Sequence, residues 1–150
     1  MLERLDAAWK AFCASYMELP ESRLIEPGVT GDWSVKDVIA HVTVWEEEAL
    51  THLPHMLAGG RPSRYATTHG GIDGFNAQAT ERTRALSLAD VLRRQEETHR
   101  RLVAFIETIP EEQFTRETRV RRRLRLDTYG HYPIHTGMIR TWRERTARPE

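Results

Sequence analysis

The stretch WSVKDVIAHVTVWEE, residues 33–47, predicts the start of a long amphipathic helix around which the rest of the chain can pack. Ser34 stands three residues before Asp37, which is the spacing of a capping box with Asp in place of the usual Glu. Apolar residues then follow at helical spacing: Val38, Val42, Trp45 and Ala49. We expect this helix to stop or kink near Pro54, with His41 on the flank of its apolar stripe.

Three other segments also have the pattern of a helix with one apolar face. The first carries apolar residues at helical spacing up to a closing proline: Leu2, Leu5, Trp9, Phe12, Tyr16, Leu19 and then Pro20. Another begins at Ser87 and ends before Pro110, and the last is expected from about Asp127 to Arg145. Four main helices, with one long loop after the second, predict an all-α antiparallel four-helix bundle.

The long loop lies between His55 and Gly74 and reads AGGRPSRYATTHGGIDG over residues 58–74. A connection of this length is uncommon in a compact domain unless it has a role. We therefore expect it to border a binding site, although a mobile surface loop has the same composition. A short helix is expected after it, over residues 75–85.

Composition narrows the class of protein. A length of 150 residues is typical of one domain, so we expect a single domain over residues 1–150. The lone Cys13 excludes an intramolecular disulfide and a cysteine-based zinc site. No apolar run reaches the roughly 18 residues of a membrane span, and the N-terminus MLERLDAAWK lacks the apolar core of a signal peptide. We expect a cytoplasmic protein without membrane contact, and a homodimer is possible.

The formal net charge is zero, but the segment from Arg116 to Arg125 is rich in arginine and could attract a polyanion. It lacks interleaved aromatic residues and any recognised DNA-binding pattern. Nucleic acid is therefore not an expected partner. We expect a solvated connector, or arginines that bind an anionic group of a substrate.

The stretch YGHYPIHTGMIRTW, residues 129–142, holds two histidines four residues apart. On a helix, His131 and His135 share a face with Met138 and Trp142, so both imidazoles are expected to point toward the core. Buried imidazoles need polar partners. A metal ion would serve both rings, with His41 as a third ligand from a facing helix. Histidines bonded to backbone carbonyls are the alternative.

Both stretches resemble the DinB/YfiT-like superfamily. WSVKDVIAHVTVWEE is similar to its second helix, where a Trp-Ser-x-x-Asp-x-x-x-His segment leads to a histidine ligand, and DTYGHYPIHTGMIRTW is similar to its final helix with a His-x-x-x-His pair. Residues 75–114, between these stretches, resemble the ClbS/DfsB branch of that superfamily. Pro133 departs from a regular helix, but it is tolerated if it falls in the first turn.

The resemblance implies a bundle with a divalent metal ion, zinc or nickel, held by His41, His131 and His135. It also implies an enzyme that acts on a small molecule by hydrolysis or by transfer that depends on a low-molecular-weight thiol. The alternatives are a non-catalytic protein that sequesters a reactive small molecule in stress or self-protection, and a helical interaction module with vestigial histidines. From the ordinary histidine pKa, metal affinity is expected to fall below about pH 6.5.

Other polar residues are weaker candidates for a functional role. Glu48, two turns after His41, could be a catalytic base or could orient the metal ligands, while a solvated helix glutamate is the simpler interpretation. Tyr132 is expected to point away from the histidine face. The remaining histidines are expected at the surface or at helix edges: His52, His55, His69 and His99.

Overall fold

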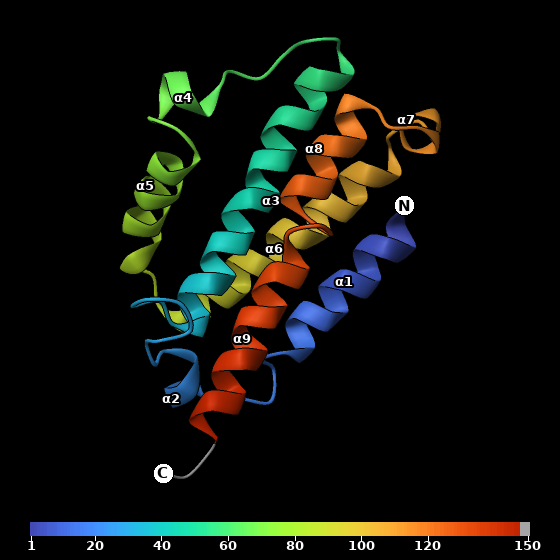
Figure 1. Ribbon diagram of the computed structural model, residues 1–150. Helices are drawn as coiled ribbons and strands as arrows, with labels where there is room; N and C mark the ends of the chain where they lie inside the picture. Colours follow the sequence, from blue (N-terminus) through green and yellow to red (C-terminus); the bar gives the residue numbers. More distant parts are fainter. Residues whose placement is uncertain (148–150) are drawn as a thin grey trace.

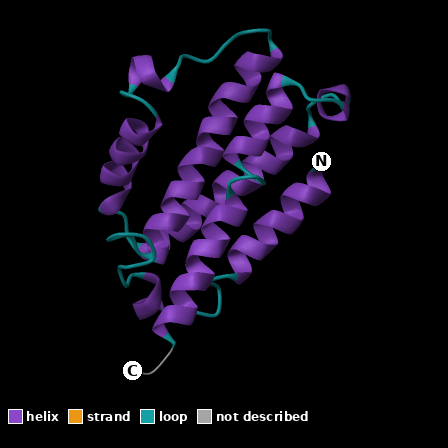
Figure 2. Cartoon of the chain, in the orientation of Figure 1, coloured by secondary structure: helices purple, strands orange, loops and turns teal. Residues whose placement is uncertain are grey.

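The computed structural model describes residues 1–147, and the regular elements in this range are helices (Figure 2). Within the same range the extended pairing amounts to one isolated bridge, between Thr30 and Trp33. No helix of the described part is long and apolar enough to cross a membrane. The all-α prediction is therefore confirmed.

Three long helices and one interrupted helix lie side by side (Figure 1). The long helices are α1 (Leu2–Ala14), α3 (Val35–Leu57) and α6 (Leu88–Glu107). The interrupted one consists of α8 (Arg119–Asp127) and α9 (Tyr132–Thr146), which follow one another along the bundle (Figure 1). Helix α3 contacts α6, α8 and α9, so it is the central helix of the fold.

The N-terminus of α3 is fixed by the predicted capping box. The Ser34 hydroxyl accepts a hydrogen bond from the Asp37 backbone N–H at 3.3 Å, and the Asp37 carboxylate accepts one from the Ser34 N–H at 2.8 Å. Ser34 is only 3 % exposed, which protects both bonds from competing water. The start of α6 is capped in a similar way, because Ser87 accepts from the Asp90 N–H at 3.1 Å.

The connection after α3 is shorter than predicted. Helix α3 continues through Pro54 to Leu57, and a loop leads to the one-turn helix α4 (Tyr65–Thr68). The expected short helix is α5 (Ile72–Arg84), which begins before the predicted residue 75 and packs against α3. An apolar cluster joins the two helices: Val44, Trp45, Phe75 and Ala79, with Tyr65 beside it. The remaining helices are α2 (Glu21–Leu24) and α7 (Glu112–Thr115).

The last helix does not begin near Asp127 as predicted, because a non-helical turn separates α8 from α9. Pro133 has no backbone N–H to donate to the carbonyl four residues earlier, so one helix cannot run unbroken through this segment. The backbone of Thr128 is not helical, with φ −134° and ψ −105°. The Gly130 N–H donates a hydrogen bond to the Arg125 carbonyl at 2.9 Å. A Cβ at Gly130 would lie 2.7 Å from that oxygen, so a side chain would not fit. Pro133 itself falls in the first turn of α9, where it is tolerated.

Candidate metal centre

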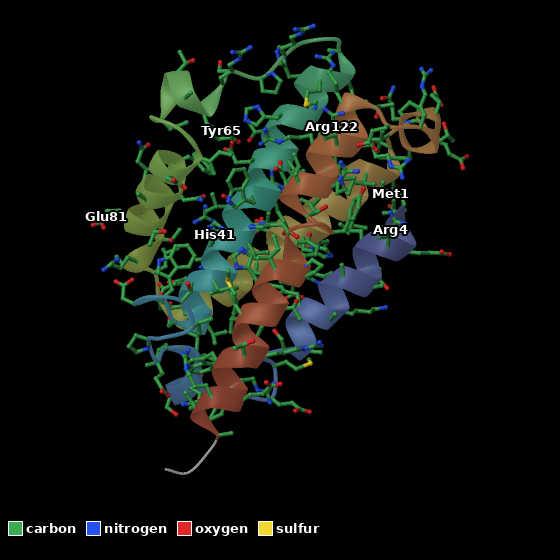
Figure 3. The ribbon with its side chains drawn as sticks, viewed as in Figure 1. Met1, Arg4, His41, Tyr65, Glu81 and Arg122 are labelled. Carbon is green, nitrogen blue, oxygen red and sulfur yellow. The ribbon has the colours of Figure 1, made fainter. Side chains whose placement is uncertain are left out.

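Three histidines, on α3 and at the start of α9, converge in the middle of the bundle. His41 lies on α3, His131 immediately precedes α9, and His135 is one turn further along (Figure 3 labels His41). The Nε2 atom of His131 lies 3.2 Å from Nε2 of His41 and 2.8 Å from Nε2 of His135. All three rings offer one nitrogen within 4.8 Å of the others. The predicted convergence of these histidines is confirmed, and metal binding by them stays a prediction.

Burial keeps these imidazoles neutral. It lowers the pKa of His41 to about 3, helped by the neighbouring His135 and His131, and lowers the pKa of His131 to about 3, helped by His135. The pKa of His135 falls to about 4 from burial alone. Neutral imidazole is the form that binds metal ions. The cluster is therefore ready to bind a metal ion without first losing protons at ordinary pH.

The spacing of the nitrogens fits a metal ion better than it fits hydrogen bonding. Three neutral imidazoles cannot satisfy one another around a common point, because each offers either one N–H or one lone pair at Nε2. A tetrahedral zinc ion with nitrogens at about 2.0–2.1 Å would hold them about 3.3 Å apart. The observed separations of 3.2 and 2.8 Å are close to that value. The shorter of the two would have to lengthen by about 0.5 Å to reach that value.

A cavity of about 290 Å³ opens beside the cluster, a size near the lower end for small-molecule sites. His41 and His131 form part of its wall, and the other lining residues come from α3, α4, α5 and α8: Trp45, Tyr65, Ile72, Asn76, Arg123, Leu126 and Asp127. Ile72 and Leu126 are large apolar residues that remain 55 % and 62 % exposed. Exposed apolar side chains at a cavity mouth are typical of a binding site.

A chain of polar contacts fixes the wall of this cavity. The Arg123 guanidinium donates to Asp127 at 2.5 Å and to the Tyr65 hydroxyl at 2.7 Å. That hydroxyl in turn donates to the Glu48 carboxylate at 2.6 Å. Burial raises the pKa of Asp127 to about 7, although the charge of Arg123 opposes the shift. The helix α4 is thereby tied to α3 and α8 through one tyrosine.

Glu48 does not lie among the residues that line the cavity. Its carboxylate holds Tyr65 and lies 3.1 Å from Nε2 of His52. This position favours an orienting role over direct contact with a substrate, and its role as a base stays a prediction.

A second cavity, of about 440 Å³, also reaches the cluster. His41, His135 and Asn76 line it together with the loop that precedes α3: Thr30, Gly31, Asp32 and Trp33, with Met138 from α9. His41 and Asn76 line both cavities. Each of the three histidines therefore lines at least one cavity.

The other histidines lie outside the cluster. His69 contacts Gln78 at 3.1 Å near the surface, and His55 packs its ring against Gly60. His99 stacks on Trp9, with ring centroids 3.6 Å apart, and lies 2.8 Å from the Glu46 carboxylate. The expectation that these histidines are not ligands of the cluster agrees with their positions. Tyr132 also points away from the cluster, into the core.

Most of the cavity residues were not predicted from the sequence. Arg123 lay within the arginine-rich segment without standing out from its neighbours, and Asn76 and Tyr65 matched no motif. A signal was present in the spacing of Arg123, Asp127 and His131, which are four residues apart and would share a face if helical. The long-loop prediction did place Tyr65 and Ile72 near a site, and both line the cavity.

Solved structures of other proteins share the fold of this chain. The structure of DfsB, a sibling lethal factor precursor, has a TM-score of 0.76 at 16% sequence identity and covers 98% of this chain and 95% of its own. An uncharacterised protein from Escherichia coli UTI89 has a TM-score of 0.82 at 13% identity, and the match covers 99% of this chain and 94% of that protein. The colibactin self-resistance protein ClbS, in complex with dsDNA, has a TM-score of 0.75 at 15% identity, covering 93% and 90%. No curated protein is significantly similar in sequence.

Two consequences follow for the predictions from sequence. The sequence led to the expectation that nucleic acid is not a partner. That expectation is not supported, because the ClbS structure is a complex with dsDNA. The resemblance noted in the two histidine-bearing stretches is confirmed, because the family model described as the DinB superfamily matches residues 4–138. The chain belongs to the DinB superfamily.

Proposed function

We propose that this protein binds one divalent metal ion, zinc or nickel, through His41, His131 and His135, and acts on a small molecule in the adjoining cavity. The observation that carries the proposal is the convergence on one point of three imidazoles, of which His41 and His135 are buried and His131 is partly buried. Three neutral ligands would leave the ion its full charge, so that it could lower the pKa of a bound water or thiol, or polarise a substrate atom. Hydrolysis and thiol-dependent transfer can both use this chemistry.

The cavity residues divide the remaining tasks. Trp45 and Tyr65 form an apolar wall against which the body of a small molecule can pack, with ring centroids 5.6 Å apart. Arg123, held in place by Asp127 and Tyr65, can donate hydrogen bonds to a carbonyl or anionic oxygen of the substrate. Asn76 accepts from the Trp45 indole at 3.1 Å, which fixes the amide between the two cavities. These residues would orient a substrate toward the histidines.

Metal content after equal exposure to zinc and nickel tests the proposal. Wild type should bind one ion per chain, whereas His41→Ala and His135→Ala should lose most of it. His69→Ala is the matched control, because it removes an imidazole outside the cluster. Equal occupancy in all four proteins would refute the metal centre. The protein should be prepared without a histidine tag, which would add its own metal ligands.

Turnover separates an enzyme from a protein that only sequesters its ligand. ClbS is a self-resistance protein by description, so a protective role is the alternative for the same cavity. A thiol panel tested against reactive small molecules, with and without a chelator, should show repeated turnover that the chelator abolishes. Stoichiometric consumption without turnover would favour the protective role.

Duplex DNA is a second candidate partner, favoured by one surface. Arg116, Arg119 and Arg122 are exposed on or just before α8, at the end of the bundle where α3 finishes (Figure 3 labels Arg122). We propose that this surface binds the phosphate backbone, which would weaken steeply with salt. An Arg119→Gln/Arg122→Gln variant should bind a labelled duplex less tightly.

The matched control for DNA binding is Arg100→Gln/Arg101→Gln, which removes the same charge from an exposed part of α6. An equal loss of affinity in both double variants would show only a general charge effect. No measurable binding by wild type at low salt would exclude this function.

A further inference from the structure

A buried carboxylate links the two helices that carry the histidine cluster. Glu46 on α3 is 0 % exposed, and its Oε1 atom accepts a hydrogen bond from the Tyr132 hydroxyl at 2.5 Å. The same oxygen lies 2.8 Å from Nδ1 of His99 on α6. The other carboxylate oxygen, Oε2, is buried without a hydrogen-bond partner. An acid placed in a core in this way is costly, so its position calls for an explanation.

One of the histidines lacks the usual means of orientation. A metal-bound histidine commonly donates its second ring N–H to a carboxylate or carbonyl, which fixes the ring. His131 has the backbone of Asp127 beside it, whereas the Nδ1 atom of His135 is buried and has no such partner. The direction of the His135 ring must therefore come from the placement of the N-terminal turn of α9 relative to α3.

The Glu46 contact acts at that turn. Tyr132 follows His131 directly, and its ring is fully buried against Trp9 and Phe12 of α1. Within the described residues, two side-chain contacts of hydrogen-bond length join α3 to the α9 segment. One is between His41 and His131, and the other is the hydrogen bond that the Tyr132 hydroxyl donates to Glu46. It therefore fixes one ligand-bearing helix against the other, one residue from His131.

We propose that Glu46 and Tyr132 are positioning residues for the histidine cluster, and that the buried hydrogen bond between them holds His131 and His135 in register with His41. This role rests on the proposed metal centre but on separate residues, none of which contacts the metal position. Loss of the bond should weaken metal binding in a protein that still folds. Replacing a residue that orients the metal ligands without touching the metal typically lowers metal affinity by about 10–100-fold. We therefore expect the affinity for Zn²⁺ to fall by about tenfold here.

The test measures the Kd for Zn²⁺ by equilibrium dialysis, and the visible spectrum of the Co²⁺ form, for wild type and Tyr132→Phe. Tyr16→Phe is the matched control. It also removes a buried tyrosine hydroxyl, which bonds to Gln95 on α6, and neither partner lies on a ligand-bearing helix. Both variants should lose similar thermal stability. Only Tyr132→Phe should bind Zn²⁺ about tenfold more weakly and alter the Co²⁺ spectrum.

Two substitutions at Glu46 keep the inference testable if Tyr132→Phe folds poorly. Glu46→Gln retains an oxygen that can accept from Tyr132, so its Kd for Zn²⁺ should match wild type. Glu46→Met has a similar size but no acceptor, and should reproduce the loss. An unchanged Kd in Tyr132→Phe and Glu46→Met, or an equal loss in Tyr16→Phe, would overturn the positioning role. Absence of Zn²⁺ binding by wild type would instead refute the metal centre, and the positioning role with it.

Discussion

The acid limit of the proposed metal binding follows directly from the burial of His41 and His135 and the partial burial of His131. Free histidines with a pKa of about 6.5 would compete with protons for the metal as soon as the pH fell below that value. In the folded protein the pKa values of His41, His131 and His135 are lowered to about 3, about 3 and about 4. The cluster should therefore bind metal over a much wider range of pH than the sequence alone suggests.

The size of this difference can be calculated at pH 5. If all three ligands had the ordinary pKa, protonation would reduce the apparent affinity by about 30,000-fold relative to high pH. With the lowered pKa values the loss at pH 5 is only about 10%, and a tenfold loss is not reached until the pH approaches 3–4. The two cases differ by more than four orders of magnitude.

Equilibrium dialysis against buffered Zn²⁺ between pH 8 and 4, with bound and free zinc measured by elemental analysis, distinguishes ligands with ordinary pKa values from ligands with lowered pKa values. We expect the Kd to stay constant within about threefold down to pH 5. Circular dichroism at each pH confirms that the protein remains folded. A thousandfold weakening between pH 7 and 5 in a folded protein would refute the burial of these ligands.

The apoprotein should lose stability as the pH falls from about 6.5 toward 4, because the unfolded chain then binds protons at histidines that stay neutral when folded. Asp127, with its pKa raised to about 7, binds a proton in the folded state and offsets part of this loss. An unchanged melting temperature over that pH range would contradict the prediction. Ser34→Ala removes a cap worth about 0.5–2 kcal/mol, so calorimetry should show a melting temperature lower by about 2–8 °C. The variant should still bind metal at saturation, and a folded protein without metal would show that Ser34 is more than a cap. Tyr65→Phe keeps the ring but removes the hydroxyl that joins Arg123 to Glu48, so trypsin should cleave the segment before α4 about fivefold faster if the bond is worth about 1 kcal/mol; an unchanged cleavage rate would exclude this tie.

Much of the fold was present in local sequence patterns. The capping box at Ser34 and the apolar stripe after it predicted the start and the buried face of α3, because both depend on residues a few positions apart. The same holds for Ser87 and α6. The break before α9 was harder to predict. Pro133 was recognised as tolerable in a first turn, but the sequence did not show that the preceding arginine-rich segment forms a separate helix, α8.

The sequence by itself indicated which three histidines could meet, because His131 and His135 share a core-facing stripe, His41 flanks the stripe of another helix, and both stretches resemble the DinB/YfiT-like superfamily. Only the tertiary structure decided their environment. The lowered pKa values arise from burial, and the cavity forms where Arg123 of α8 meets Tyr65 of α4. Helical periodicity is set by neighbours along the chain, whereas desolvation and contacts between helices depend on packing of segments that are distant in sequence.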